Sequence, residues 1–166
     1  LIGVPVLYKA LLAREEFSGD KLKNLRVAFV GGDYVPKSLL AEFNERMIKY
    51  GSEARLYEGY GLTETVTVCS VNTTLAHRDG SVGKAVGGVK IAAFDGEKML
   101  AAGEEGELCV SGDVLMTGYL GDENATDAAF FEHDGEKFVR SGDVGSVDKD
   151  GYVYFRSRIK RIAKVN

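Results

Sequence analysis

The order strand, helix, strand in the first third of the chain constrains the fold most. Residues 25–30 are mostly apolar and end at Gly31 and Gly32, which is typical of a short buried strand. Pro36 then begins a helix, and a second short strand follows at residues 55–57. The apolar residues of this helix recur at helical spacing, at Leu39, Leu40, Phe43, Met47 and Ile48. This order predicts parallel strands with the helix packed against their sheet.

The second half of the chain has a different pattern. From Gly80 onward, short alternating segments are separated by turn pairs such as Asp95-Gly96, which is typical of β-hairpins. The strand candidates are residues 89–94, 106–111, 137–140, 145–148 and 152–156. A short helix is expected at residues 122–131, where Asp122 or Asn124 can cap the first turn. The fold class is therefore α/β plus β, with a parallel α/β part followed by a small antiparallel barrel or sheet.

Composition and charge argue against several classes of protein. The 166 residues are 45% hydrophobic and carry a formal net charge of -4, which suits one globular domain. No basic block indicates nucleic acid, and no apolar run reaches the roughly 18 residues that a transmembrane helix needs. Cys69 and Cys109 lack metal-ligand spacing, so we expect buried reduced thiols. The N-terminus has no secretory pattern, and we expect a cytoplasmic protein.

Residues 57–64, Tyr-Glu-Gly-Tyr-Gly-Leu-Thr-Glu, combine residue types that a hydrophobic core does not require. A tyrosine ring can stack on a purine, and glycine lets the backbone approach a ligand closely. The hydroxyl of Thr63 can donate to phosphate, and the carboxylate of Glu64 can hold Mg²⁺ between protein and phosphate oxygens. This chemistry indicates a nucleotide. The alternative is a strand end followed by a capped helix, with Thr63 and Glu64 in its first turn.

Other motifs stand in order on both sides of this segment. They are Gly31-Gly32-Asp33-Tyr34-Val35-Pro36 before it and, after it, residues 80–84, residues 106–112, Thr117-Gly118-Tyr119, residues 140–143 and residues 157–160. In this order the motifs resemble the adenylate-forming, or AMP-binding, superfamily, which contains acyl-CoA synthetases, adenylation domains of peptide synthetases and luciferases. The resemblance runs from about Gly31 to the last residue, and its specificity comes from the ordered set of motifs.

The resemblance implies a site for ATP or AMP. Tyr60 would cover the adenine, and Glu58 and Gly59 would border it. Thr63 and Glu64 would be catalytic, because they would bind phosphate and Mg²⁺ where negative charge develops as pyrophosphate leaves. The implied nucleotide-binding residues are Gly32, Asp33, Glu58, Gly59, Tyr60, Gly61, Thr63, Asp143 and Arg158.

Three of the implied roles lie near the end of the chain. Asp143 would accept both ribose hydroxyls, since a carboxylate has two acceptor oxygens. Arg158 would contact ribose and phosphate through its fork of donors. Lys160 would be the hinge at which a C-terminal domain pivots. Ser141 and Ser157 depart from the family, which usually has threonine and glycine at these positions.

Plain structural roles compete with these assignments. Asp33 can cap the helix that follows it, Gly142-Asp143 can form a turn between two strands, and Arg158 can belong to a solvated basic patch. His77 and His133 have no Ser, Cys or carboxylate constellation around them, so no catalytic histidine is expected.

The activity that the resemblance implies is that of an AMP-forming acyl-CoA synthetase. It would activate a carboxylic acid, expected to be fatty or aryl, with ATP and Mg²⁺, and then pass the acyl group to CoA. Members of the superfamily are several times longer, so we expect this chain to be a piece of a larger enzyme. Its parts would be an α/β subdomain (1–79), a β-rich subdomain (80–156) and a hinge to a C-terminal domain (157–166). The family's phosphate loop and C-terminal lysine lie outside this sequence, so we expect the chain alone to be inactive.

Two other functions remain open. An adenylation domain that loads an amino acid onto a carrier protein would share nearly all of these residues. A non-catalytic nucleotide-binding module would keep the same fold. Dependence of the intact protein on free CoA would separate the first from the synthetase.

Overall fold

The structure is a computed structural model that describes residues 1–159. The chain separates into two compact units, the first formed by Leu1–Tyr60 and the second beginning at Gly61. The boundary after residue 79 stays a prediction, and the proposed hinge Lys160 lies outside the described residues.

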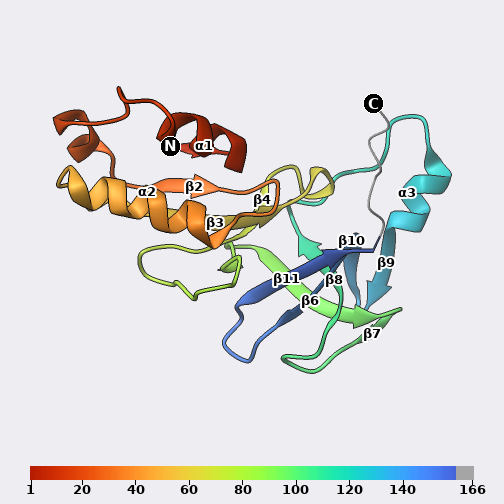
Figure 1. Ribbon diagram of the computed structural model, residues 1–166. Coiled ribbons are helices and arrows are strands. Elements are labelled where there is room, and N and C mark those ends of the chain that lie inside the picture. The colour runs from red at the N-terminus through yellow and green to blue at the C-terminus, as the bar shows by residue number, and fades with distance from the viewer. Residues whose placement is uncertain (160–166) are drawn as a thin grey trace. The chain divides into compact units, whose positions relative to one another are not determined.

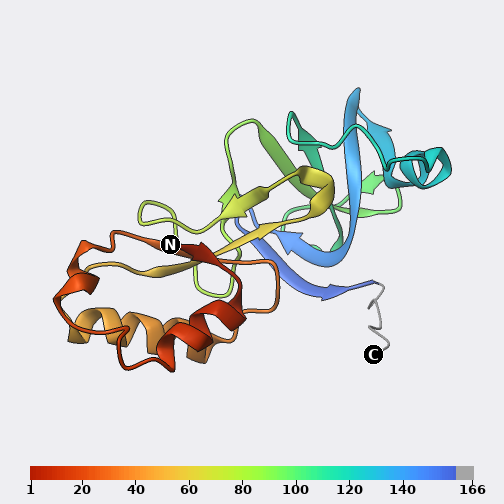
Figure 2. The same cartoon turned by 90° about the horizontal axis from the view of Figure 1, so that it is seen from above.

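The first unit is a small parallel sheet with two α-helices on one face. Its strands are β1 (Ile2–Gly3), β2 (Ala28–Val30) and β3 (Leu56–Gly61). Its α-helices are α1 (Pro5–Leu12) and α2 (Lys37–Lys49), and a short 3-10 helix, η1 (Asp20–Asn24), lies between them in the sequence. β2 pairs in parallel with both β1 and β3. Figures 1 and 2 show α1 and α2 lying next to each other on the same side of these strands. The parallel strand–helix–strand arrangement predicted from the sequence is confirmed.

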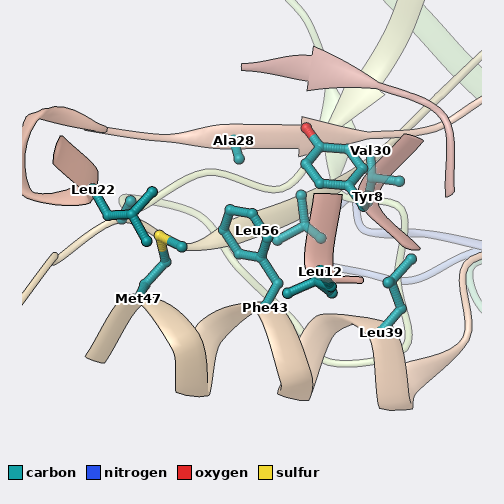
Figure 3. Packing of buried hydrophobic residues seen from close by; sticks show 10 residues of the cluster. Tyr8, Leu12, Leu22, Ala28, Val30, Leu39, Phe43, Met47 and Leu56 are labelled. Atoms are coloured by element: carbon teal, nitrogen blue, oxygen red, sulfur yellow. The ribbon is translucent and has the colours of Figure 1, made fainter. Parts of the chain in front are cut away.

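Both helices pack their apolar faces on this sheet (Figure 3). The buried side chains are Tyr8 and Leu12 from α1, Leu39, Phe43 and Met47 from α2, and Ala28, Val30 and Leu56 from the strands. The Tyr8 hydroxyl donates to the Phe29 carbonyl oxygen at 2.7 Å, and burial raises the pKa of Tyr8 to about 12. The prediction that Ile48 belongs to the buried apolar face is wrong, because this residue is 60% exposed. Ile48 is rotated by about 100° around the helix from the buried Met47.

The second unit contains a short antiparallel pair and a curled antiparallel sheet. The pair is β4 (Val68–Val71) with β5 (Lys84–Ala85). The curled sheet has the order β11-β10-β8-β6-β7, and β9 also pairs with β10. Its strands are β6 (Val89–Asp95), β7 (Lys98–Met99), β8 (Gly106–Gly112), β9 (Phe130–His133), β10 (Glu136–Val147) and β11 (Val153–Arg158). Figure 1 shows how these strands cross and curl. The predicted fold class, an α/β part followed by antiparallel β structure, is confirmed.

Two local predictions in this unit need correction. Residues 137–140 and 145–148 were expected to form two strands, but β10 runs through both segments as one strand. Its register against β8 shifts between Arg140 and Val144, so the intervening residues form an irregularity within the strand. The helix expected at 122–131 is shorter: α3 (Glu123–Ala129) is capped by the Asp122 carboxylate, and β9 begins directly after it.

An aromatic cluster explains why the chain turns from α3 into β9. Phe131 lies 5.0 Å from Phe94 of β6 and 5.7 Å from Phe138 of β10, measured between ring centroids. Phe131 points into this cluster from β9, which is paired with β10. Burying an aromatic ring stabilises a core by more than continuing a short helix would, so tertiary packing ends the helix at Ala129.

Candidate nucleotide-binding site

The glycine-rich turn of the first unit is shaped by close backbone approach. A Cβ at Gly31 would lie 2.6 Å from the Gly59 carbonyl oxygen, so only glycine fits there. Gly32 has φ +78°, in the left-handed region that favours glycine. Asp33 is exposed, and its carboxylate accepts the amide of Tyr34 at 2.7 Å. Helix α2 begins after Pro36 without a capping side chain, so the alternative of Asp33 as its cap is not seen.

The adenine candidates lie on a strand. The sequence predicts a strand at 55–57 with the motif after it, but β3 continues to Gly61 and carries Glu58, Gly59 and Tyr60 within it. Glu58 and Gly59 are partly exposed, whereas Tyr60 as a whole residue is only 8% exposed. Stacking of Tyr60 on adenine therefore stays a prediction. An adenine ring would have to reach a tyrosine ring that the protein mostly covers.

Thr63 and Glu64 lie in a single tight turn of the second unit, η2 (Thr63–Thr65), and not in the first turn of a longer helix. The buried Thr65 closes this turn: its Oγ1 accepts the Leu62 amide at 3.3 Å and lies 3.0 Å from the Leu62 carbonyl oxygen. A Cβ at Gly61 would lie 2.3 Å from the Thr67 carbonyl oxygen, so the chain entering the turn touches the chain leaving it. Thr63 is consequently exposed and Glu64 half-buried at the surface of the turn.

The backbone just after the turn is strained. Val66 has φ +62° and ψ -37°, and the Thr67 amide donates to the Thr65 carbonyl oxygen at 2.6 Å. This is a γ-turn, which is rare and strained for a β-branched residue. Strained residues persist only where the surrounding structure fixes them, and they cluster at functional sites.

A tyrosine that the sequence analysis treated only as part of a motif contacts the Glu64 carboxylate. The Tyr119 hydroxyl donates to Glu64 Oε1 at 2.7 Å, and the Met116 amide donates to the Glu64 carbonyl oxygen at 2.8 Å. The hydrogen bond to Glu64 raises the pKa of Tyr119, with smaller contributions from burial and from the negative charge. The signal in the sequence was the motif Thr117-Gly118-Tyr119, but no local pattern connects it with a residue 55 positions earlier.

Asp143 and Arg158, the ribose candidates, are brought together directly. They are register partners in the antiparallel pair of β10 and β11, and Arg158 Nε lies 2.9 Å from Asp143 Oδ1. The Asp143 side chain is 5% exposed and that of Arg158 is 49% exposed. The amide of Ile159 donates to the Gly142 carbonyl oxygen at 2.7 Å, which holds the end of β11 in place. The pairing favours a specific role for Arg158 over membership of a solvated basic patch.

The irregularity in β10 presents the Asp143 carboxylate and is held by a second acid. The Gly142 amide donates to Glu107 Oε1 at 3.0 Å, and the Asp143 amide donates to Ser141 Oγ at 3.0 Å. Arg140 Nη1 lies 3.3 Å from Glu107 Oε2. Gly142 has φ +70°, which glycine adopts without a steric cost. Glu107 lies within one of the ordered motifs, residues 106–112, but no role for it was predicted from the sequence.

Cys69 of β4 is a fully buried, reduced thiol. Burial raises the pKa of the Cys69 thiol to about 11, a hydrogen bond with Thr65 lowers it, and the charge of Asp143 raises it further.

The donor set fits Mg²⁺ bound together with a nucleotide. Among the described residues, no group of three or more His, Cys, Asp or Glu side chains could hold a metal ion by itself. Mg²⁺ commonly takes one or two carboxylates and completes its shell with substrate phosphates and water. The single carboxylate of Glu64, next to the exposed hydroxyl of Thr63, suits that mode of binding. In the described part of the chain, no helix is long and apolar enough to cross a membrane.

Comparisons with known proteins agree with this geometry. A family model described as AMP-binding enzyme matches residues 1–120. The long-chain-fatty-acid–CoA ligase of Thermus thermophilus is 36% identical, over 98% of this chain and 31% of the relative. A feruloyl-CoA synthase of Amycolatopsis sp is 34% identical, over 96% of this chain and 31% of the relative. A plipastatin synthase of Bacillus subtilis is 31% identical, over 99% of this chain and 6% of the relative.

A solved structure gives the same result for the fold. The structure of apo MatB from Rhodopseudomonas palustris superposes with a TM-score of 0.81 at 29% identity, covering 96% of this chain and 31% of that chain. This chain thus spans about a third of the length of the CoA ligases and synthases that it matches. The extent of the family match and the identity to these relatives show that the chain belongs to the family of AMP-binding enzymes.

Proposed function

We propose that the intact protein containing this chain is an AMP-forming acid–thiol ligase. It would join a carboxylic acid to the α-phosphate of ATP, with loss of pyrophosphate, and then transfer the acyl group from the adenylate to the thiol of CoA, with release of AMP. Family membership supports an adenylate-forming reaction, and the named ligases among the relatives support CoA as the acceptor.

The observation that carries the proposal is the pairing of Asp143 with Arg158 across β10 and β11. A buried carboxylate beside a guanidinium offers acceptors for a vicinal diol and donors for phosphate within one small region. Arg158 is half-exposed, so its side chain can move toward a bound phosphate while Asp143 accepts the ribose hydroxyls. The departure at Ser141 keeps a hydroxyl beside Asp143, since Ser141 Oγ accepts the hydrogen bond of the Asp143 amide at 3.0 Å.

The turn at Thr63 and Glu64 would bind the phosphates. The Thr63 hydroxyl is exposed to donate to a phosphate oxygen, and the Glu64 carboxylate would hold Mg²⁺. When bound, Mg²⁺ would neutralise charge on the phosphate oxygens as pyrophosphate leaves. The turn itself is fixed by Thr65 and by contact between Gly61 and Thr67, so these groups need little reorganisation during the reaction.

We propose a fatty or aryl acid as the substrate. The relatives that act on such acids by name, the long-chain-fatty-acid–CoA ligase and the feruloyl-CoA synthase, support this class. Selectivity between acids of similar shape involves only about 1–3 kcal/mol per methylene.

A second candidate is an adenylation domain that loads a carrier protein. The match to the plipastatin synthase over 99% of this chain favours it. In this case Asp143, Arg158, Thr63 and Glu64 would keep the same roles in forming the adenylate. Only the thiol that accepts the acyl group would differ.

The test uses the intact protein with a panel of fatty, aryl and amino acids. Acid-dependent ATP–pyrophosphate exchange is expected, followed by thioester formation with free CoA and no carrier protein. Exchange with an amino acid but no CoA thioester would favour the carrier-loading function. Absence of exchange with every acid, in a protein that binds AMP, would overturn the ligase proposal and favour a non-catalytic nucleotide-binding module.

A further inference from the structure

The Tyr119 hydroxyl is aimed at one particular oxygen of the proposed metal-binding carboxylate. It donates to Glu64 Oε1 at 2.7 Å, whereas no residue that the structure describes donates to Oε2. A carboxylate that accepts a hydrogen bond at one oxygen keeps the other oxygen for a cation. A free glutamate side chain samples many rotamers, and its immobilisation costs conformational entropy on binding. A partner that fixes it beforehand removes part of that cost.

Tyr119 is itself held at the backbone. Its amide donates to Thr126 Oγ1 at 2.9 Å, and Thr126 Oγ1 donates to the Asp122 carbonyl oxygen at 2.8 Å. Asp122 caps α3 through the Ala125 amide. The preceding Gly118 packs against Thr126 so closely that a Cβ would lie 2.8 Å from its methyl carbon. The start of α3 therefore anchors the backbone from which the tyrosine ring extends.

The segment of residues 116–119 makes a second hydrogen bond to Glu64, at its backbone. The Met116 amide donates to the Glu64 carbonyl oxygen at 2.8 Å, so residues 116–119 contact both the backbone and the side chain of Glu64. Glu64 is half-exposed. Packing alone would not require a hydroxyl donor to lie against its carboxylate. Hydrogen bonds from neighbouring groups commonly orient the residues that ligate metals.

We propose that Tyr119 is a positioning residue for Glu64, and that its hydroxyl holds the carboxylate so that Oε2 takes the Mg²⁺ of the bound nucleotide. This inference rests on the proposed function, specifically on the role of Glu64. Tyr119 contacts neither the reacting atoms nor the metal, and it acts through Glu64 alone. Its effect must therefore disappear when the carboxylate is removed.

The test measures metal affinity as well as activity. Mn²⁺ is titrated into the intact protein saturated with a non-hydrolysable ATP analogue, and free Mn²⁺ is followed by electron paramagnetic resonance. Tyr119→Phe is expected to weaken Mn²⁺ binding by about tenfold, the lower end of the range for groups that orient metal ligands. The rate of adenylate formation should recover at high Mg²⁺, because the reacting groups are intact.

Tyr154→Phe is the matched control. Tyr154 also donates its hydroxyl to a carboxylate, Asp148 at 3.1 Å, but that carboxylate is not one of the proposed site residues. This variant is expected to bind Mn²⁺ as the unmodified protein does. Thermal unfolding of both variants checks that each remains folded.

The Glu64→Gln variant and the double variant separate the metal-binding role of Glu64 from the positioning role of Tyr119. Glu64→Gln should weaken Mn²⁺ binding more than Tyr119→Phe does, and Tyr119→Phe should add nothing in the Glu64→Gln background. If Glu64→Gln leaves Mn²⁺ binding unchanged, the proposed role of Glu64 fails. If Glu64→Gln weakens binding but Tyr119→Phe does not, or tightens it, the positioning role of Tyr119 is overturned while the proposed function stands.

Discussion

Arg158 Nε lies 2.9 Å from Asp143 Oδ1, across the strand pair that ends the described part of the chain. The acid is buried and the arginine is half-exposed, so the pair has one fixed member and one that can move. A ribose phosphate offers two hydroxyls and a phosphate group. The fixed Asp143 carboxylate can accept from the hydroxyls, and the Arg158 guanidinium can move to donate to the phosphate.

Replacement of Arg158 by lysine should separate charge from geometry. Lysine keeps the positive charge beside Asp143 but loses the planar fork of donors. We expect Arg158→Lys to weaken AMP binding by roughly tenfold, and to change the free energy of unfolding by less than about 1 kcal/mol because the pair is partly exposed. Calorimetric titration with AMP and urea unfolding measure the two effects. Unchanged AMP affinity would mean that Arg158 does not contact the nucleotide.

Substitution at Gly61 should disturb the phosphate turn. A Cβ at this position would lie 2.3 Å from the Thr67 carbonyl oxygen, so Gly61→Ala must shift the backbone that carries Thr63 and Glu64. We expect a loss of about 1–3 kcal/mol of stability and weaker binding of Mg·ATP. Gly87→Ala is the control, because a Cβ there meets no atom within 4 Å. Equal Mg·ATP affinity in both variants would contradict the assignment of this turn to phosphate.

The Tyr8 hydroxyl should contribute to stability without affecting the nucleotide site. It is buried and donates to the Phe29 carbonyl oxygen at 2.7 Å, which ties α1 to β2. Tyr8→Phe removes the hydroxyl that donates to the Phe29 carbonyl oxygen, and it should lower the free energy of unfolding by about 1 kcal/mol. Tyr34→Phe, at a site where the ring is exposed, should be neutral. A neutral result for Tyr8→Phe as well would show that the bond contributes no net stability.

Acid stability should depend on Asp148. Burial alone would raise the pKa of Asp148, but hydrogen bonds from the Tyr152 amide, the Tyr154 hydroxyl and Arg78 outweigh it and hold this pKa below its ordinary value. A carboxyl whose pKa is lower in the folded state stabilises the fold above its unfolded pKa of about 3.9. That contribution is lost as the pH falls through the folded-state pKa.

Asp148→Asn removes this pH-dependent contribution. The variant should be less stable at neutral pH, and its unfolding midpoint in urea should fall less between about pH 4 and pH 2 than that of the unmodified protein. Asp127→Asn, at an exposed position of α3, is the control and should leave the pH profile unchanged. If the unfolding midpoint of Asp148→Asn changed with pH in parallel with that of the unmodified protein, Asp148 would not be responsible for the loss of stability in acid.

The elements set by local sequence were predictable. Pro36 precedes α2, Asp122 caps α3, and a turn follows Asp95, each as the sequence indicates, whereas the short strand β7 after that turn was not predicted. These features depend on residues within a few positions of one another, and fixed dihedral angles or short-range hydrogen bonds decide them.

The remaining features depend on contacts between distant residues. Strand β10 continues through Ser141 and Gly142 because Glu107, 35 residues earlier than Gly142, accepts the Gly142 amide. Local residue types there favour a turn, and the long-range bond reverses that preference. The contact of Tyr119 with Glu64 is equally invisible to periodicity and spacing. Asp143 and Arg158 could be named as candidates, but their direct pairing follows only from the register of β10 and β11.

The most direct test of the central claim compares two aspartates, each of which pairs with an arginine. Asp143 pairs with Arg158, and Asp148 pairs with Arg78. AMP is titrated by calorimetry into the intact protein and into its Asp143→Asn and Asp148→Asn variants. We predict that Asp143→Asn weakens AMP binding by about a hundredfold or more, since buried hydrogen bonds to a charged group are lost, while Asp148→Asn binds as the unmodified protein does. Equal AMP affinity for all three proteins would contradict the assignment of Asp143 to the nucleotide ribose.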